Sequence, residues 1–228
     1  SDFRYIKSVY KESFEEDRVI QMILDNNIQT IFHLAASSLL GPSATDPLLY
    51  YWNNTAKTIT FLHKLANAGW KGHIIFSSTA AVYGDQPDPV TETSPLNPCN
   101  HYGKSKLICE HALSIAKMYG IETTVFRYFN VAGAYHTGEI GESHNPETHL
   151  IPLVLDVAIG KREHIKVFGT DYDTSDGSAV RDYIHVTDLA DAHILALEYL
   201  KKDGKSDIFN LGNGDGYSVF EVISKAKE

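Results

Sequence analysis

The sequence predicts an α/β fold built on a doubly wound, mostly parallel sheet, with a smaller C-terminal region that covers a substrate. Short apolar segments typical of buried strands alternate with longer segments that have the apolar spacing of helices. This alternation favours right-handed crossovers between parallel strands. From about residue 132 the alternation gives way to long polar loops. We therefore predict two domains, residues 1–131 and residues 132–228, with segments of the second returning to the sheet.

Residues 1–131 supply most of the predicted sheet and its first helices. The spacing of Ser13 and Glu16 predicts a capping box for the first helix. Asp46 as N-cap and Pro47 at the first position begin a long helix, and Gly69 ends it. The expected strands are 3–9, 30–36, 73–78 and 123–131, and the expected helices are 13–27, 46–68 and 102–118.

The second region has a less regular pattern. The expected elements are helix 150–160, strand 165–169, strand 182–186, helix 188–200, strand 207–212 and a final helix. The segment GNGDG at 212–216 follows a strand and precedes a helix, as a dinucleotide-binding loop does. No strand with an acidic residue about 20 positions further on follows it, so we interpret it as a tight strand-to-helix turn.

Composition excludes several classes of function. The net charge of −9 argues against a nucleic-acid surface, and no apolar run approaches the roughly 20 residues of a membrane helix. The two cysteines form no Cys-x-x-Cys pair, which favours a reducing compartment, and we expect a cytoplasmic protein. None of the eleven histidines lies in a His-Glu-x-x-His spacing, so we expect scattered histidines and no metal site.

Polar and small residues follow three predicted strands, in HLAAS, FSSTAAVYG and FRYFNVAG. Ligands of such sheets bind beyond the carboxyl ends of the strands. The helix that starts near Tyr102 carries Lys106 on the same face. By itself this spacing is weak, because roughly one Tyr-x-x-x-Lys match is expected by chance in such a chain. The hydroxyls of Ser77, Ser78 and Thr79, at the end of a predicted strand, favour a functional interpretation of this Tyr–Lys spacing.

The Tyr–Lys pair is suited to proton transfer. A phenol with a pKa near 10 is a poor base, but a neighbouring ammonium favours the phenolate and lowers that pKa. Such a tyrosine, with a hydroxyl beside it, can exchange a proton with a substrate alcohol while hydride leaves the same carbon. The alternative is a tyrosine and a lysine that merely share a helix face, with Thr79 capping a turn.

Several longer motifs resemble those of the UDP-glucose 4-epimerase family, which belongs to the extended short-chain dehydrogenases/reductases. They are FSSTAAVYG, YGKSK, RYFNVAGA, HNPETHLIPLVLDVAIGKR, VFGTDYDTSDGSAVRDYIHVTDLADAH and NLGNGDGYSV. The resemblance implies a Rossmann-like fold, an NAD cofactor and a UDP-sugar substrate. It implies interconversion of UDP-galactose and UDP-glucose by transient oxidation at C4, as in galactose metabolism.

The resemblance also implies the site residues. Tyr102 would be the base, Lys106 would hold the NAD ribose, and Thr79 would bridge the tyrosine and the substrate O4. The implied cofactor contacts are Leu34, Ala35, Ala36, Ser38, Asn53, Ser77, Ser78, Tyr102, Lys106 and Phe129. The implied substrate contacts are Thr79, Tyr102, Asn130, His149, Leu150, Lys166, Val167, Phe168 and Arg181, with the arginine as a diphosphate clamp.

Some alternatives stay open. Arg181 could instead form a structural salt bridge, and His149 could be a loop packing residue. A dehydratase needs acid/base groups where this chain has Ala80 and Ala81, so that activity is set aside. Another nucleotide-sugar 4-epimerase, or an inactive fragment of one, is not excluded.

Two further expectations follow from the comparison with the family pattern. The family's Gly-x-x-Gly-x-x-Gly turn is missing and the substrate region stops early, so we expect a chain truncated at both ends. Ser38 stands where a lysine is common, which is a departure on the cofactor side. In the family, helices matching 46–68 and 102–118 pair with their copies, which implies a homodimer.

Overall fold

The computed structural model describes residues 6–86, 89–203 and 205–227, and the chain divides into two compact units. The first unit combines Ser1–Tyr128 with Asp191–Asn210, and the second combines Phe129–Ala190 with Leu211–Glu228. Within the described residues, no helix is both long and apolar enough to cross a membrane.

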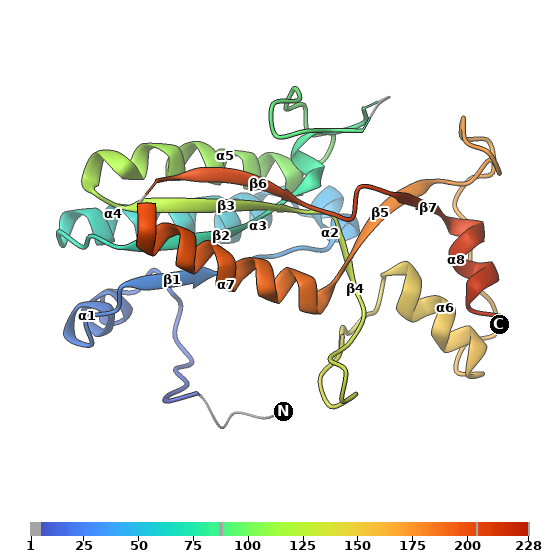
Figure 1. Cartoon of the computed structure of the whole chain (residues 1–228), viewed down its shortest axis with the longest axis horizontal. Helices are drawn as coiled ribbons and strands as arrows, with labels where there is room; N and C mark the ends of the chain where they lie inside the picture. Colours follow the sequence, from blue (N-terminus) through green and yellow to red (C-terminus); the bar gives the residue numbers. More distant parts are fainter. Residues whose placement is uncertain (1–5, 87–88, 204, 228) are drawn as a thin grey trace. The chain divides into compact units, whose positions relative to one another are not determined.

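The first unit is built on a four-stranded sheet of order β1-β2-β3-β6, seen in Figure 1. The strands are β1 (Thr30–His33), β2 (His73–Thr79), β3 (Glu122–Tyr128) and β6 (Asp207–Leu211). β2 is parallel to both β1 and β3, with His73 in register with Thr30 and Glu122. The predicted α/β class with a parallel sheet is confirmed.

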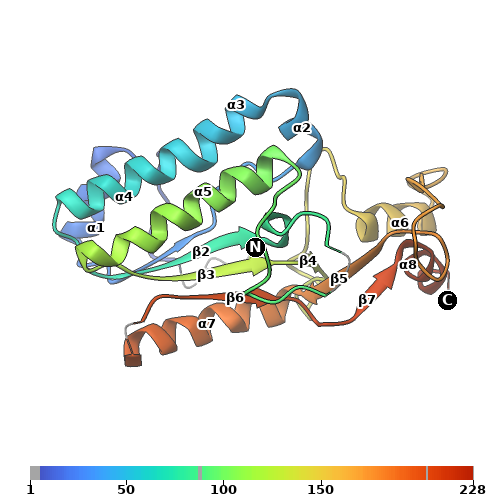
Figure 2. The ribbon, with the colours of Figure 1, turned by 90° about the horizontal axis from the view of Figure 1, so that it is seen from above.

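Helices cover both faces of this sheet. On one face lie α1 (Asp17–Asp25), α4 (Lys57–Asn67) and α5 (His101–Ala116), and Figure 2 shows α4 and α5 side by side. Their apolar residues form one core with the sheet: Ile20, Ile23, Phe61, Leu62, Leu65, Trp70, Ile74, Phe76, Cys109, Leu113, Ala116, Ile121 and Val125. On the other face, His193 of α7 (Val186–Asp203) packs against the ring of Phe126.

The long helix predicted over 46–68 is continuous but not regular. After a separate short helix α2 (Leu40–Thr45) come α3 (Pro47–Tyr50), a π-helical segment over Tyr51–Ala56, and α4. The Asp46 carboxylate accepts a hydrogen bond from the Leu49 amide at 3.2 Å, and Gly69 follows the helix with φ of 70°, so both predicted ends are confirmed. π-helical turns occur often at functional sites.

The second unit contains a three-stranded sheet of order β4-β5-β7. β4 (Asn130–Ala132) is parallel to β5 (Val180–His185), which is antiparallel to β7 (Gly216–Ser218); α6 (Leu150–Ala158) and α8 (Val219–Lys225) complete the unit. The Asp182 carboxylate accepts hydrogen bonds from the amides of Asn213 and Gly214 at 2.7 and 3.0 Å. The GNGDG segment is therefore a tight turn, but it leads from β6 to β7 rather than directly to a helix.

Three local predictions were wrong. Residues 6–9 are irregular, with Ile6 and Val9 exposed, because no strand pairs with them; residues 3–5 of the predicted strand lie outside the described residues. The predicted capping box fails because Ser13 bonds the Glu15 side chain instead, and Glu16 makes no side-chain cap. The segment 165–169 is loop rather than strand.

Candidate active site

Tyr102 lies in the first turn of α5, beside the carboxyl end of β2. The Asn100 side chain caps this helix by accepting a hydrogen bond from the Gly103 amide at 2.7 Å. Gly103 allows close packing here, because an added Cβ would lie 2.6 Å from the carbonyl oxygen of Ala81. The helix start is thereby held against the 3-10 turn Ala80–Val82 that follows Thr79.

The Thr79 hydroxyl has two neighbours in this structure. It accepts a hydrogen bond from the Ala81 amide at 3.1 Å, which caps the turn, and it interacts with the Tyr102 side chain. The turn cap weighed from the sequence is therefore present, and the catalytic use of this hydroxyl stays a prediction. Burial raises the pKa of Tyr102 to about 12, although the bond with Thr79 acts in the opposite direction. The expected lowering of this pKa is not found, because burial outweighs the stabilising contacts.

Lys106 is buried one helical turn after Tyr102. Its ammonium donates to the Ser77 carbonyl at 2.6 Å and lies 4.6 Å from the centre of the Phe76 ring. Burial lowers the pKa of Lys106 to about 8, against the opposing effects of Cys109 and Glu110. The lysine is therefore charged at neutral pH, next to the strand end that carries the hydroxyls.

A buried ion pair lies next to the carboxyl end of β2, and the sequence prediction missed it. Glu110 of α5 pairs with Arg127 of β3 at 2.7 Å and also accepts a hydrogen bond from the Ser78 hydroxyl. Arg127 also donates to the Tyr83 hydroxyl at 2.9 Å. One signal was available, since a charged residue inside the otherwise apolar strand TTVFRYF requires a buried partner.

A cavity of about 230 Å³ opens after β1, where three residues of the predicted cofactor site lie. Its lining residues are Phe14, Ala35, Ala36, Ser37, Asn53 and Lys57. Leu34 and Ser38 are not among them, although Leu34 is exposed beside Ala35. The sequence prediction missed Phe14, Ser37 and Lys57 because they belong to no motif.

Asn54, also missed, fixes the loop that forms one wall of this cavity. Its buried amide accepts from the Ser37 amide at 2.8 Å and donates to the Ser37 carbonyl at 2.9 Å and to the Ser105 hydroxyl at 3.0 Å. The neighbouring Asn53 donates to the Ser37 hydroxyl at 3.2 Å. The π-helical segment thus joins the loop after β1 to α5.

The first unit fits a dinucleotide cofactor. The small side chains of Ala35 and Ala36 leave room for a ligand to approach the backbone at the carboxyl end of β1. Lys57 brings a positive charge to the cavity, although it also pairs with Glu15 at 3.2 Å. The Lys106 ammonium supplies buried donors beside the second strand end.

The remaining predicted residues belong to the second unit. Asn130 begins β4 and donates to the Asp182 carbonyl at 2.8 Å, and Phe129 precedes it. Arg181 is exposed on β5 and donates to the Val180 carbonyl at 2.8 Å. The other predicted substrate residues lie in loops or next to them. His149 and Leu150 are at the start of α6, and Lys166, Val167 and Phe168 are in a loop, where Phe168 is 82% exposed.

Comparison with known proteins identifies the family. A family model described as "NAD dependent epimerase/dehydratase family" matches residues 7–212. The chain belongs to this family. Two similar curated proteins are UDP-glucose 4-epimerases: that of Halalkalibacterium halodurans is 48% identical over 96% of this chain and 66% of its own length, and that of Lactobacillus helveticus is 47% identical over 96% and 67%. The chain thus spans about two thirds of the curated relatives it matches.

Solved structures agree with this assignment. UDP-glucose 4-epimerase from Brucella ovis in complex with NAD superposes with a TM-score of 0.89 and 42% identity, covering 95% of this chain and 67% of that one. The enzyme from Bifidobacterium longum in complex with NAD+ and UDP gives a TM-score of 0.87 and 36% identity, covering 97% and 68%. The resemblance drawn from the sequence is confirmed.

Proposed function

We propose that this protein is an NAD-dependent UDP-glucose 4-epimerase that interconverts UDP-galactose and UDP-glucose. The observation that carries the proposal is the cluster of Thr79, Tyr102 and Lys106 at the carboxyl end of β2. Phenol, hydroxyl and ammonium are the groups that proton exchange with a substrate alcohol requires. The two curated relatives are UDP-glucose 4-epimerases, and their name indicates the class of sugar substrate.

The chain's own residues would bind the cofactor and the substrate, orient them, and move the proton. The residues around the cavity after β1, with Ser77, Ser78, Lys106 and Phe129, would hold NAD, which when bound supplies reversible oxidation of a sugar carbon. Tyr102 would carry the O4 proton, and Thr79 would hold that oxygen against the phenol. Since burial raises the pKa of Tyr102, its phenolate requires a nearby positive charge, and Lys106, one helical turn further along α5, would provide it.

The second unit would supply most of the UDP-sugar contacts, as the first would supply most of the NAD contacts. The exposed guanidinium of Arg181 suits a diphosphate, because its N–H donors match two phosphate oxygens at once. Asn130, His149, Leu150 and the segment 166–168 would contact the sugar and uridine. These roles rest on the family resemblance.

A second candidate is a 4-epimerase with a broader or different sugar preference. The UDP-Glc/GlcNAc 4-epimerase from Campylobacter jejuni is 41% identical to this chain with a TM-score of 0.77. N-acetylated and other UDP-sugars are therefore included in the test below.

We also propose a homodimer through α3–α4 and α5. The surface of these helices carries exposed apolar side chains, including Leu48 (76% exposed), Trp52 (61%) and Ile59 on one helix and Ile108 and Ile115 on the other. Ile108 and Ile115 are seven residues apart in the regular helix α5, a spacing that places them on one helix face. Of the aromatic residues, Tyr50 is buried in the chain's own core whereas Trp52 is exposed. A second copy would cover this stripe.

A cytoplasmic location belongs to the same proposal. Cys99 and Cys109 are both free thiols, which is compatible with a reducing compartment.

The proposed function is tested with UDP-galactose deuterated at C4. The purified protein supplied with NAD should form UDP-glucose that keeps its deuterium, without accumulation of free NADH, because an epimerase produces no net oxidation. UDP-N-acetylgalactosamine in a parallel reaction tests the second candidate. Stoichiometric release of NADH, or a protein that binds NAD and UDP but converts neither sugar, would contradict the proposal.

A further inference from the structure

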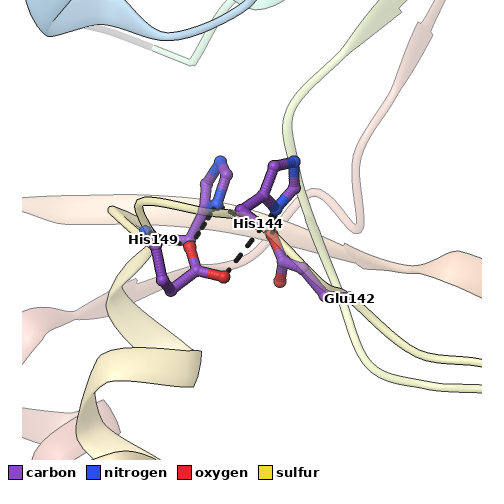
Figure 3. A group of neighbouring side chains, drawn as sticks. Glu142, His144 and His149 are labelled. Carbon is purple, nitrogen blue, oxygen red and sulfur yellow. Dashed lines mark hydrogen bonds and ion pairs between the residues drawn. The ribbon is translucent and has the colours of Figure 1, made fainter.

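Two histidines and two glutamates converge in the loop that precedes α6. Figure 3 shows Glu142, His144 and His149 from this loop, with their side chains turned toward one another. Together with Glu147 they place four potential ligand atoms within 4.8 Å of one another. We refer to these four residues as the loop cluster. All of them belong to the second unit, and none is used by the proton-transfer chemistry proposed above.

The distances suit tetrahedral coordination. Zinc–nitrogen and zinc–oxygen bonds of about 2.0–2.2 Å place neighbouring ligands roughly 3.3–3.6 Å apart. The Nδ1 atom of His149 lies 2.8 Å from oxygens of both Glu142 and Glu147. The Nδ1 atom of His144 lies 3.0 Å from Glu142 and 3.7 Å from Glu147. Side-chain shifts of well under an ångström for most pairs would bring these atoms to ligand spacing.

Part of the cluster is already oriented by the backbone. One Glu147 oxygen accepts hydrogen bonds from the amides of Thr148 and His149, each at 2.8 Å. A carboxylate held in this way is pre-positioned, as the outer contacts of metal ligands require.

The charge balance favours a divalent cation. Among the described residues, the ion-pair partners of the Glu142 and Glu147 carboxylates are His144 and His149. A divalent ion would neutralise these carboxylates and take the place of the protons that the imidazole Nδ1 atoms now donate to carboxylate oxygens. Imidazole nitrogen favours zinc and similar transition metals over Mg²⁺ and Ca²⁺.

We propose that Glu142, His144, Glu147 and His149 bind one Zn²⁺ ion. The ion would tie the loop at residue 142 to His149, the N-cap residue of α6. Because His149 and Leu150 are assigned to the substrate in the proposed function, the metal's effect on catalysis rests on that proposal. The binding itself does not.

The sequence predicts scattered histidines and no metal site, and the proposed site departs from that expectation for this pair, whose rings lie 4.9 Å apart. The spacing Glu-x-His-x-x-Glu-x-His matches no helical metal motif, and a loop had to fold back for its ligands to meet.

The test is calorimetric titration of the metal-free protein with ZnCl2. We expect about one equivalent to bind, and we expect His144→Ala/His149→Ala to weaken that binding at least 100-fold. Glu163→Gln/His164→Ala is the matched control, since this exposed Glu–His pair in the same unit lies 4.0 Å apart outside the loop cluster. The control should bind zinc as the unaltered chain does. MgCl2 in place of ZnCl2 should give no binding.

A readout independent of catalysis completes the design. Zinc should raise the melting temperature of the unaltered chain and of the control, but not that of His144→Ala/His149→Ala. Equal zinc affinity in that variant and the unaltered chain, or no zinc binding at millimolar concentration, would overturn the proposal. Neither titration contains NAD or sugar, so a failed zinc site and a failed epimerase assignment are separate results.

Discussion

Removing one partner of the buried Glu110–Arg127 pair should destabilise the protein strongly. The two side chains are only 3% and 2% exposed and approach to 2.7 Å. Glu110→Gln keeps the shape of the side chain but leaves the Arg127 guanidinium buried without a counter-charge. Burial lowers the pKa of Arg127, and the contacts with Glu110 and Tyr83 more than restore it, so the folded state depends on them.

The magnitude follows from the geometry. At 2.7 Å, two unit charges attract by roughly 6 kcal/mol at an effective dielectric constant of about 20. Desolvation of both groups offsets much of this attraction in the intact pair. Breaking such a pair from one side typically costs about 3–5 kcal/mol, because the second charge stays buried. We expect a loss in this range for Glu110→Gln and for Arg127→Met.

Urea denaturation of both single variants and the double variant, at pH 8 and pH 5, is the assay. The double variant should lose less stability than the sum of the single losses, because no unpaired charge remains. Arg127→Met should be less destabilised at pH 5 than at pH 8, since a buried carboxylate without its cation gains stability by taking up a proton. Additive losses, or single losses below about 1 kcal/mol, the usual range for exposed pairs, would refute the reasoning.

Three further predictions concern the first unit. Gly84→Ala should lower the free energy of unfolding by more than about 2 kcal/mol, because at φ of 70° the added Cβ would lie 2.0 Å from a backbone oxygen. Gly69→Ala, with the same φ and no atom within 4 Å of the added Cβ, should lower it by only about 1 kcal/mol. Equal losses for the two variants in thermal melts would contradict this. His33 has a pKa lowered to about 4 by burial and by the charge of a nearby lysine, so the folded state disfavours its protonation. The stability of the unaltered chain relative to His33→Gln should fall between pH 6.5 and 4, by up to about 3 kcal/mol, and a difference that does not change with pH would contradict this. Asn54→Ala should lower the free energy of unfolding in urea by about 2–3 kcal/mol, because the three hydrogen bonds of this buried side chain are lost, and an unchanged value would refute that role.

The sequence predicted the sheet and the chemistry at its edge because both depend on local patterns. The apolar pattern of the sequence predicted the bounds of β2 and β3 to within a few residues. Asn100 and Gly103 allow the close approach that brings Tyr102 to Thr79. The resemblance of long motifs then assigned roles that the spacing of Tyr102 and Lys106 alone left open.

What the sequence did not predict depends on tertiary contacts. The capping box at Ser13 failed because a nearby carboxylate competed for its hydroxyl, and residues 6–9 found no partner strand. The high pKa of Tyr102 follows from burial, which no motif records. The ion pair of Glu110 and Arg127 joins a helix to a strand, so neither sequence segment alone identifies it.

The loop cluster is a further such case. Its ligands are close in sequence, yet a non-helical path brings them together, so helix-based spacing rules do not apply.

The central claim is that Tyr102 moves the proton of the sugar hydroxyl, and one comparison tests it most directly. The epimerisation rate of Tyr102→Phe at saturating UDP-galactose should fall about 10²–10⁴-fold, the usual contribution of a general acid–base group. Tyr119→Phe, at a tyrosine that is 55% exposed, is the control and should keep the full rate. NAD binding should persist in both variants, measured by fluorescence. Equal turnover by Tyr102→Phe and the unaltered protein would contradict the account.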